Sequence, residues 1–383
     1  MDLATHKRLT ALASTSIDRI ADNCSRYGIQ FPNHGVGQRY LLKENINWLA
    51  GFWPGILWLC ASQVEERETS LFTKTAGSLL PSFETRLNQQ VHITHDLGFL
   101  FMLSARAQWE ITQDQEAYQL GLRAADALLA RYRPAGQYIQ AWGPVGDPKE
   151  GGRIIADTMM NLPLLFWASH VTGDGRYRQA AFDHAVNTQA HLIRADGSSY
   201  HTFFFDQTTG DPLYAATHQG HHNESLWARG QAWLIYGFAL AAHWCDEPRF
   251  VTASQKTAAR FLAELPADGV PLWDLRLPSD ADAPRDSSAA AIAACGLFRL
   301  AQLTQESRYL RQAEALLTAL IDHCFEFSAE GEGLLKHGAL HIPKGWAPDD
   351  YLIFGDYFFL EALLTAEGKN PDFWGQTTGI SIL

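Results

Sequence analysis

The chain has 383 residues, of which 46% are hydrophobic, so a large core is possible, and its formal net charge is −12. Its lysines and arginines are scattered, which disfavours nucleic acid and anionic membrane surfaces as partners. Five widely spaced cysteines within or beside apolar runs are interpreted as buried free thiols of a cytoplasmic protein. Neither a signal-like apolar core near the N-terminus nor a span of membrane-crossing length is found.

Amphipathic segments recur along the chain, with apolar residues three and four positions apart, so each is predicted as an outer helix that buries one face. These segments span residues 5–28, 70–89, 114–133, 174–194, 247–265 and 307–325. Other segments are apolar or small nearly all round, as expected for inner helices covered on both sides. They include Leu97–Trp109, Leu162–Val171, Ala232–Trp244 and Ala289–Leu303. The alternation predicts an all-α fold, an (α/α)6 barrel of six inner and six outer helices, with residues 1–383 forming a single domain.

Polar or aromatic clusters stand at the starts of the predicted inner helices and recur at similar intervals. The clusters are Asn47–Trp53, His95–Phe99, Asp157–Asn161, Arg229–Trp233, Arg285–Ser288 and Asp349–Tyr351. Because the chain reverses within each hairpin, all inner helices run the same way and present their amino ends at one mouth. Residues of different clusters are therefore expected to line one cleft.

Two clusters place a lone carboxylate at a helix start, Asp96 directly after His95 and Asp157 one repeat later. Each aspartate could simply cap free backbone amides. In an apolar cleft, however, burial would raise the pKa of a carboxyl group and keep it protonated nearer neutral pH, as general acid catalysis requires. We interpret Asp157 and Asp96 as the candidate catalytic pair.

Tryptophans gather in or beside the same clusters, at positions 48, 53, 142, 227 and 233. Any single one could be a core residue. Together they favour a sugar pocket, because the flat C–H face of a sugar ring stacks on an indole while its hydroxyls find polar partners.

Two histidine groups, His92–Asp96 and His218–His222, have spacings that resemble metal sites. Neither shows a helical His-Glu-x-x-His pattern, so no metal or other cofactor is predicted. His95 and His201 are expected to hydrogen-bond the substrate or the aspartates, and the last two histidines of the second group are expected to be exposed. Arg229 is interpreted either as a surface ion-pair partner or as a planar donor to a sugar acid.

Taken together, these motifs closely resemble the unsaturated glucuronyl hydrolases of glycoside hydrolase family 88, from about Tyr40 to about Leu364. The matching segments are Trp48–Trp53, His95–Phe99, Ile139–Pro144, Gly151–Asp157, Ser199–Phe203, Thr217–Gly220, Trp227–Trp233, Arg285–Ser288 and Pro348–Tyr351. The resemblance implies an (α/α)6 barrel that releases a terminal 4,5-unsaturated uronic acid from the oligosaccharides produced by polysaccharide lyases. It implies hydration of a vinyl ether, in which Asp157 protonates C4 and then accepts a proton from water adding at C5, with Asp96 as the second essential aspartate.

The same resemblance implies a set of substrate-binding residues. They are Trp48, His95, Trp142, His201, Gln219, Trp227, Arg229 and Trp233. The chain departs from the family pattern at 221–226 and at 340–344, which both border the outer pocket and bear on the leaving sugar.

Other functions fit parts of this pattern. An unsaturated rhamnogalacturonyl hydrolase would keep the fold and the chemistry, a sugar 2-epimerase would use histidines instead of aspartates, and a carbohydrate-binding module would have lost catalysis. Two aspartates at neighbouring helix starts favour a hydrolase, although fold alone decides nothing.

Overall fold

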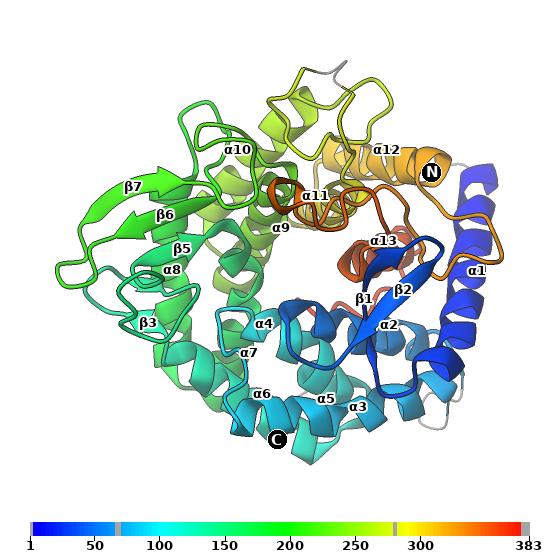
Figure 1. The fold of residues 1–383 in the computed structure, drawn as a ribbon, viewed down its shortest axis with the longest axis horizontal. Coiled ribbons are helices and arrows are strands. Elements are labelled where there is room, and N and C mark those ends of the chain that lie inside the picture. The colour runs from blue at the N-terminus through cyan, green and yellow to red at the C-terminus, as the bar shows by residue number, and fades with distance from the viewer. Residues whose placement is uncertain (1–2, 66–69, 279–281, 377–383) are drawn as a thin grey trace.

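Helices form two concentric rings in this computed structural model, which describes residues 3–65, 70–278 and 282–376 (Figure 1). The outer ring consists of α1 (Leu3–Tyr27), α3 (Leu71–Asn88), α6 (Gln115–Leu129), α8 (Gly175–Leu192), α10 (Pro248–Ala263) and α12 (Ser307–His323). Side chains of Ser70, Asp114, Asp174 and Glu247 accept hydrogen bonds from first-turn amides and so set where four of these helices begin. The predicted outer segments are confirmed within a few residues.

The inner ring is formed by helices that are buried nearly all round. They are α2 (Phe52–Ala61), α4 (Leu97–Phe101), α5 (Ala107–Thr112), α7 (Leu162–Thr172), α9 (Ala228–Cys245), α11 (Ser287–Thr304) and α13 (Ile353–Ala366). Helix α13 packs against α2, which closes the ring, so the predicted all-α (α/α)6 barrel is confirmed. The predicted continuous helix Leu97–Trp109 is wrong in one respect, because a π-helical turn, Met102–Arg106, separates α4 from α5.

Glycines allow the inner helices to approach closely where the site is built. A Cβ atom on Gly51 would lie 2.1 Å from the carbonyl oxygen of Phe99, and one on Gly98 would lie 2.3 Å from the Cα of Asn161. The Asn161 Oδ1 also accepts a hydrogen bond of 2.8 Å from the Phe99 amide. These contacts hold the starts of neighbouring inner helices together, and with them the segments that carry the two candidate catalytic aspartates.

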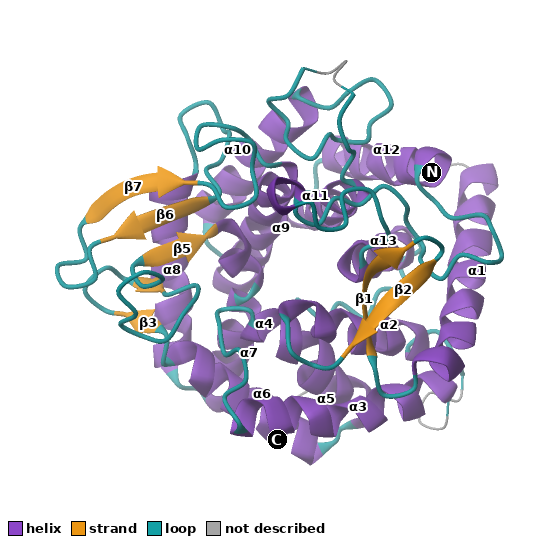
Figure 2. Ribbon diagram, viewed as in Figure 1, coloured by secondary structure: helices purple, strands orange, loops and turns teal. Residues whose placement is uncertain are grey.

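Short antiparallel strands lie in the segments that connect the helices (Figure 2). They pair as β1 (Phe31–Val36) with β2 (Arg39–Lys43), β3 (Tyr132–Arg133) with β4 (Tyr138–Ile139), and β5 (Arg153–Ile155) with β6 (Thr202–Phe205), which also pairs with β7 (Pro212–Ala216). Strand β5 leads directly into a 3-10 turn, Ala156–Met160, so the sheet supports Asp157.

The C-terminal segment closes the end of the barrel opposite the mouth. The Trp374 indole is fully buried and donates a hydrogen bond of 2.9 Å to Oε2 of Glu361. The other carboxylate oxygen of Glu361 lies 2.5 Å from the hydroxyl of Tyr236. Burial of this carboxyl group raises its pKa from 4.5 to about 7.

We expect Glu361→Gln to weaken the pH dependence of stability. Because the folded protein keeps a proton on Glu361 that the unfolded chain loses above pH 4.5, the free energy of unfolding falls as pH rises from 4.5 to about 7. The contribution is roughly 3 kcal/mol for a pKa difference of this size. Urea unfolding at about pH 5 and about pH 8 measures it. An identical pH dependence in both proteins would contradict this assignment.

All five cysteines are free thiols, and all except the partly exposed Cys245 are buried, as predicted. Within the described ranges, none of the helices combines the length and apolar character needed to cross a bilayer.

Candidate active site

A cavity of about 620 Å³ opens at the mouth of the barrel, where the inner helices begin. Its walls are formed by Asn33, His34, Lys43, Asn47, Trp48, Leu49, Asp96, Trp142, Asp157, His218, Gln219, Trp227, Arg229, Trp233, Leu340, His341, Lys344, Gly345, Trp346 and Ala347. Eight of the ten residues predicted for the site therefore lie on this cavity. The other two, His95 and His201, are buried directly behind it.

Asp96, Asp157 and His95 form the polar centre of the cavity. The Nε2 atom of His95 lies 3.4 Å from Oδ1 of Asp96 and 3.9 Å from Oδ1 of Asp157. The other ring nitrogen of His95 is 2.7 Å from the hydroxyl of Thr158, which fixes the plane of the imidazole. The second oxygen of Asp96 accepts a hydrogen bond of 2.7 Å from Thr94. Each carboxylate is thus held from a different inner helix.

Asp157 lies at a helix start and also has the properties of an acid. Its Oδ1 atom is buried and has no hydrogen-bond partner in the described structure. Desolvation, and then the neighbouring charge of Asp96, raise the pKa of Asp157 well above its usual value. A raised pKa favours the protonated form, and a protonated carboxyl group on the cavity wall can deliver a proton to a bound molecule.

His201 lies behind the cavity as a neutral ring with a defined tautomer. Its Nδ1 atom accepts hydrogen bonds from the backbone amides of His218 and Gln219, at 3.0 and 3.1 Å. The proton of the neutral imidazole must therefore be on Nε2, which has no partner among the described residues. Burial lowers the pKa of His201 well below its usual value, with His218 and Arg229 acting in the same direction.

Trp227 is enclosed by other side chains on both sides. Its ring centroid lies 4.3 Å from that of His201, and the guanidinium carbon of Arg229 lies 4.6 Å from the Trp227 ring. Only part of the indole therefore reaches the cavity.

Arg229 is not a surface ion-pair partner, because its side chain is 1% exposed and pairs with the fully buried Asp286 at 2.5 Å. The same Nη1 atom donates to the carbonyl of Ala339, and Nη2 donates to that of Leu340, both at 2.7 Å. Gln219 also donates to the Leu340 carbonyl, at 2.9 Å. Arg229 and Gln219 thus hold the loop that forms the outer wall of the cavity.

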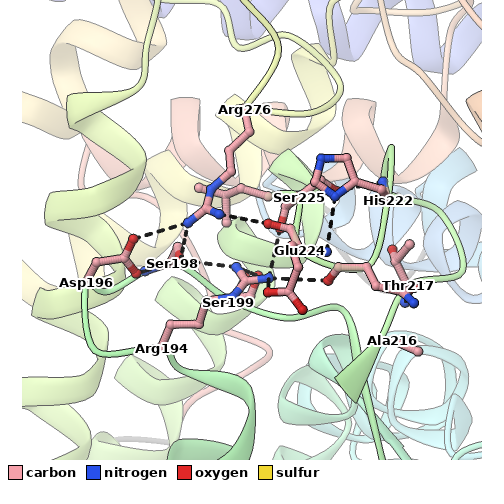
Figure 3. Close-up of polar contacts among 12 residues, drawn as sticks. Arg194, Asp196, Ser198, Ser199, Ala216, Thr217, His222, Glu224, Ser225 and Arg276 are labelled. Carbon is pink, nitrogen blue, oxygen red and sulfur yellow. Dashed lines mark hydrogen bonds and ion pairs between the residues drawn. The ribbon is translucent and has the colours of Figure 1, made fainter. Parts of the chain in front are cut away.

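The segment 217–226 carries His218 and Gln219 and departs from the family pattern at its C-terminal half. Two arginines, Arg194 and Arg276, hold this segment through hydrogen bonds to its backbone, as Figure 3 shows. Arg194 donates to the Ser225 carbonyl at 3.1 Å, and Arg276 donates to the Glu224 carbonyl at 2.8 Å. His221 and His222 are exposed, as predicted.

The outer wall contains residues that sequence reasoning did not select. The hairpin β1–β2 adds Asn33, His34 and Lys43, and the 340–347 loop adds Lys344 and Trp346. The loop was expected to border the outer pocket, but none of its residues was selected. The hairpin was missed because the prediction followed the alternation of inner and outer helices.

Two tryptophans belong to the core more than to a sugar pocket. Trp53 is 1% exposed and packs edge-on against Tyr27 at 5.0 Å, away from the cavity, so its place among the mouth tryptophans was wrong. Trp233 touches the cavity but is also 1% exposed, with ring contacts to Phe99 and Phe358 at 5.2 and 5.4 Å. In contrast, Trp48 and Trp142 are partly exposed on the cavity wall.

One ligand set in the site could hold a divalent cation. His95, Asp96 and Asp157 each offer one atom, and these three atoms lie within 4.8 Å of one another. The raised pKa of Asp157 favours its protonated form, which suits the group to proton transfer. The same protonation opposes metal binding, because a carboxyl group must lose its proton to coordinate a cation.

Comparison with known proteins supports the family resemblance over nearly the whole chain. Residues 20–366 match the family described as Glycosyl Hydrolase Family 88. The chain is 43% identical over 362 residues to an unsaturated glucuronyl hydrolase of Bacillus sp. (strain GL1), covering 92% of this chain and 95% of that protein. It is 37% identical over 381 residues to an unsaturated chondroitin disaccharide hydrolase of Streptococcus pyogenes serotype M1, covering 97% and 94%.

Structural comparison supports the same assignment. The crystal structure of an unsaturated glucuronyl hydrolase from Bacillus sp. GL1, described as responsible for the degradation of glycosaminoglycan, matches with a TM-score of 0.93 at 41% identity. The match covers 97% of this chain and 100% of that chain. The chain therefore belongs to glycosyl hydrolase family 88.

Proposed function

We propose that this protein is an unsaturated glucuronyl hydrolase that removes a terminal 4,5-unsaturated uronic acid from lyase-generated oligosaccharides. The observation that carries the proposal is the Asp157 carboxyl group, which lines the cavity, has its Oδ1 atom buried near His95 and has a raised pKa. The names of the relatives support a glycosaminoglycan disaccharide as substrate.

In the proposed reaction, Asp157 gives its proton to C4 of the vinyl ether, and positive charge develops at C5 and the ring oxygen. Water adds at C5, and its proton returns to Asp157, which regenerates the acid. The product is a hemiketal, which opens and expels the remaining saccharide. The negative charge of Asp96 stabilises this positive charge. Asp96 is close enough to do so, because one of its carboxylate oxygens lies within 4.8 Å of an Asp157 oxygen.

The remaining predicted residues have two kinds of role in this proposal. Trp48 and Trp142 offer partly exposed indole faces to sugar rings, and His95 and His201 offer buried ring nitrogens. Gln219, Trp227, Arg229 and Trp233 shape the walls. We also propose that the chain acts as a single catalytic domain in the cytoplasm, which the five free thiols support.

Absorbance of the substrate double bond tests the function directly. Chondroitin, hyaluronan and heparin are digested with lyases, the protein is added, and loss of the near-ultraviolet absorbance is followed. Loss with at least one disaccharide is expected. Products of a rhamnogalacturonan lyase are tested in parallel, and exclusive loss with them would favour the alternative hydrolase. Binding without loss of absorbance on any substrate would contradict a hydrolase.

We expect thorough chelation and dialysis to leave the rate unchanged. Hydration of a vinyl ether needs only proton transfer and water, and the raised pKa of Asp157 opposes a bound cation. The initial rate is measured before and after treatment with a chelator. Loss of activity that added zinc, manganese or calcium alone restores would overturn this expectation.

A further inference from the structure

Three outer helices end in an arginine whose side chain points to the mouth loops. Arg86 lies in the last turn of α3, and Arg131 and Arg194 each lie two residues after the end of α6 and α8. A basic residue at a helix C-terminus commonly stabilises the last carbonyls of its own helix. These three donate instead to carbonyls of loops that lead to or from the inner helices, which indicates another role.

Arg131 makes the most complete set of such contacts, and it is 4% exposed. Its Nη1 atom donates to the carbonyl of Ile93 at 2.9 Å, and its Nη2 atom donates to those of Ala141 and Gly143, at 3.1 and 2.9 Å. Its Nε atom donates to the Gln140 carbonyl at 2.9 Å. A single planar fork thus joins the turn before His95 to the loop that carries Trp142.

The link from Arg131 to the reacting groups is short. The Ala141 carbonyl that accepts from Arg131 also accepts from the backbone amide of His95, at 2.9 Å. His95 and the next residue, Asp96, are the groups that face Asp157. Displacement of this carbonyl would therefore move the polar centre of the cavity, while the inner helices stayed in place.

Arg194 makes corresponding contacts just after the end of α8 (Figure 3). It donates to the Ser199 carbonyl at 2.8 Å, two residues before His201, and to the Ser225 carbonyl at 3.1 Å, two residues before Trp227. Its guanidinium also lies over the Tyr200 ring at 3.8 Å. Arg194 thus joins both ends of the region that holds His218 and Gln219 at the cavity.

Arg86 makes similar contacts with the segments that precede α2 and α4. It donates to the Asn47 carbonyl at 2.7 Å and to the His92 carbonyl at 3.1 Å. Asn47 in turn caps the short helix that begins with Trp48, through a hydrogen bond of 3.0 Å to Leu49.

We propose that Arg86, Arg131 and Arg194 are positioning residues for the hydration reaction, which hold the mouth loops so that the catalytic and substrate-contacting groups converge. The inference rests on the proposed function. It assigns different loops to different arginines: Arg131 acts on the catalytic centre, and Arg194 acts on the substrate-contacting loop. Lysine cannot replace either, because it is a point charge that lacks the planar fork needed to reach several carbonyls at once.

The test compares Arg131→Lys and Arg194→Lys with the wild type on the disaccharide that it cleaves best. Near-ultraviolet circular dichroism and thermal unfolding give the folded fraction. We expect kcat of folded Arg131→Lys to fall about 10- to 100-fold, as misplacement by about 1 Å produces. For Arg194→Lys we expect KM to rise about fivefold, with kcat within about threefold, as loss of one hydrogen bond to substrate suggests.

Matched controls are Arg133→Lys, two residues after Arg131, and Arg178→Lys, near the start of α8, which carry the same change at other arginines. Among the described residues, Arg133 donates only to the nearby carbonyls of Ala130 and Arg131, and Arg178 donates to the Cys245 carbonyl. Both controls should retain kcat and KM within about twofold. An inactive wild type would refute the proposed function itself, which separates the two failures.

Two outcomes overturn the proposal. One is that folded Arg131→Lys and Arg194→Lys keep both kcat and KM within about twofold of the wild type. The other is that activity falls only in proportion to the unfolded fraction, as a purely structural role predicts. If Arg131→Lys does not fold, the Arg194→Lys result decides alone, because that side chain is 12% exposed and part of its surroundings is solvent.

Discussion

Replacing Asp157 by asparagine is expected to abolish turnover, with a loss of about 100- to 10,000-fold, while the fold is retained. The amide has nearly the same size, but it cannot give a proton to the double bond and take one back from water. Because Oδ1 of Asp157 has no partner within the described part of the chain, little hydrogen bonding is lost with the carboxyl group. The initial rate of absorbance loss and the melting temperature are measured together.

Asp356→Asn is the matched control, because Asp356 is also a buried aspartate whose pKa burial raises, to about 7. It lies in α13 away from the cavity and accepts hydrogen bonds from the amides of Leu334 and Leu335 and from the hydroxyl of Tyr40, at 2.8, 2.9 and 2.7 Å. This substitution should lower the melting temperature and leave kcat of the folded protein unchanged. More than about a tenth of normal activity in Asp157→Asn would defeat the assignment of the acid.

Replacing Trp233 by alanine is expected to destabilise the protein by about 3 to 5 kcal/mol, as removal of a buried tryptophan usually does. Its ring lies in an aromatic cluster with Phe99 of α4 and Phe358 of α13. The cluster continues to Trp374 at the far end of the barrel, through the stacked ring of Phe358. Urea unfolding gives the change in free energy, and KM is measured on the folded fraction.

Trp142→Ala is the comparison, because Trp142 is partly exposed on the cavity wall and its ring partners are His218, edge-on at 4.9 Å, and the Arg153 guanidinium at 4.8 Å. It should raise KM by the loss of a stacking surface and change stability much less than Trp233→Ala does. A small stability change in Trp233→Ala together with a large rise in KM would show that Trp233 acts on the sugar and that its role as a core residue is secondary.

The double ring of helices could be predicted because its physical cause is local. A helix that is covered on both sides must be apolar all round, as α9 is. A helix with one solvent-exposed face has an apolar stripe on the opposite face, as α12 does. The π-helical turn at Met102–Arg106 could not be predicted, since its residues are as apolar and helix-compatible as their neighbours. The hairpin β1–β2 was missed because it interrupts the helical rhythm.

The sequence by itself determined that the starts of the inner helices meet at the mouth, because equivalent ends of repeated hairpins must come together, and Asp96, Asp157 and Trp48 therefore share one cavity. Only the tertiary structure decided what each side chain is free to do there. Arg229 could have faced a sugar acid, but Asp286 and two loop carbonyls occupy its guanidinium. Those partners lie at least 57 residues away in the chain, so no local pattern contains them. Whether the hydrogen-bond donors of a side chain are already occupied depends on such distant contacts. Helical periodicity, in contrast, depends on neighbours three and four residues apart.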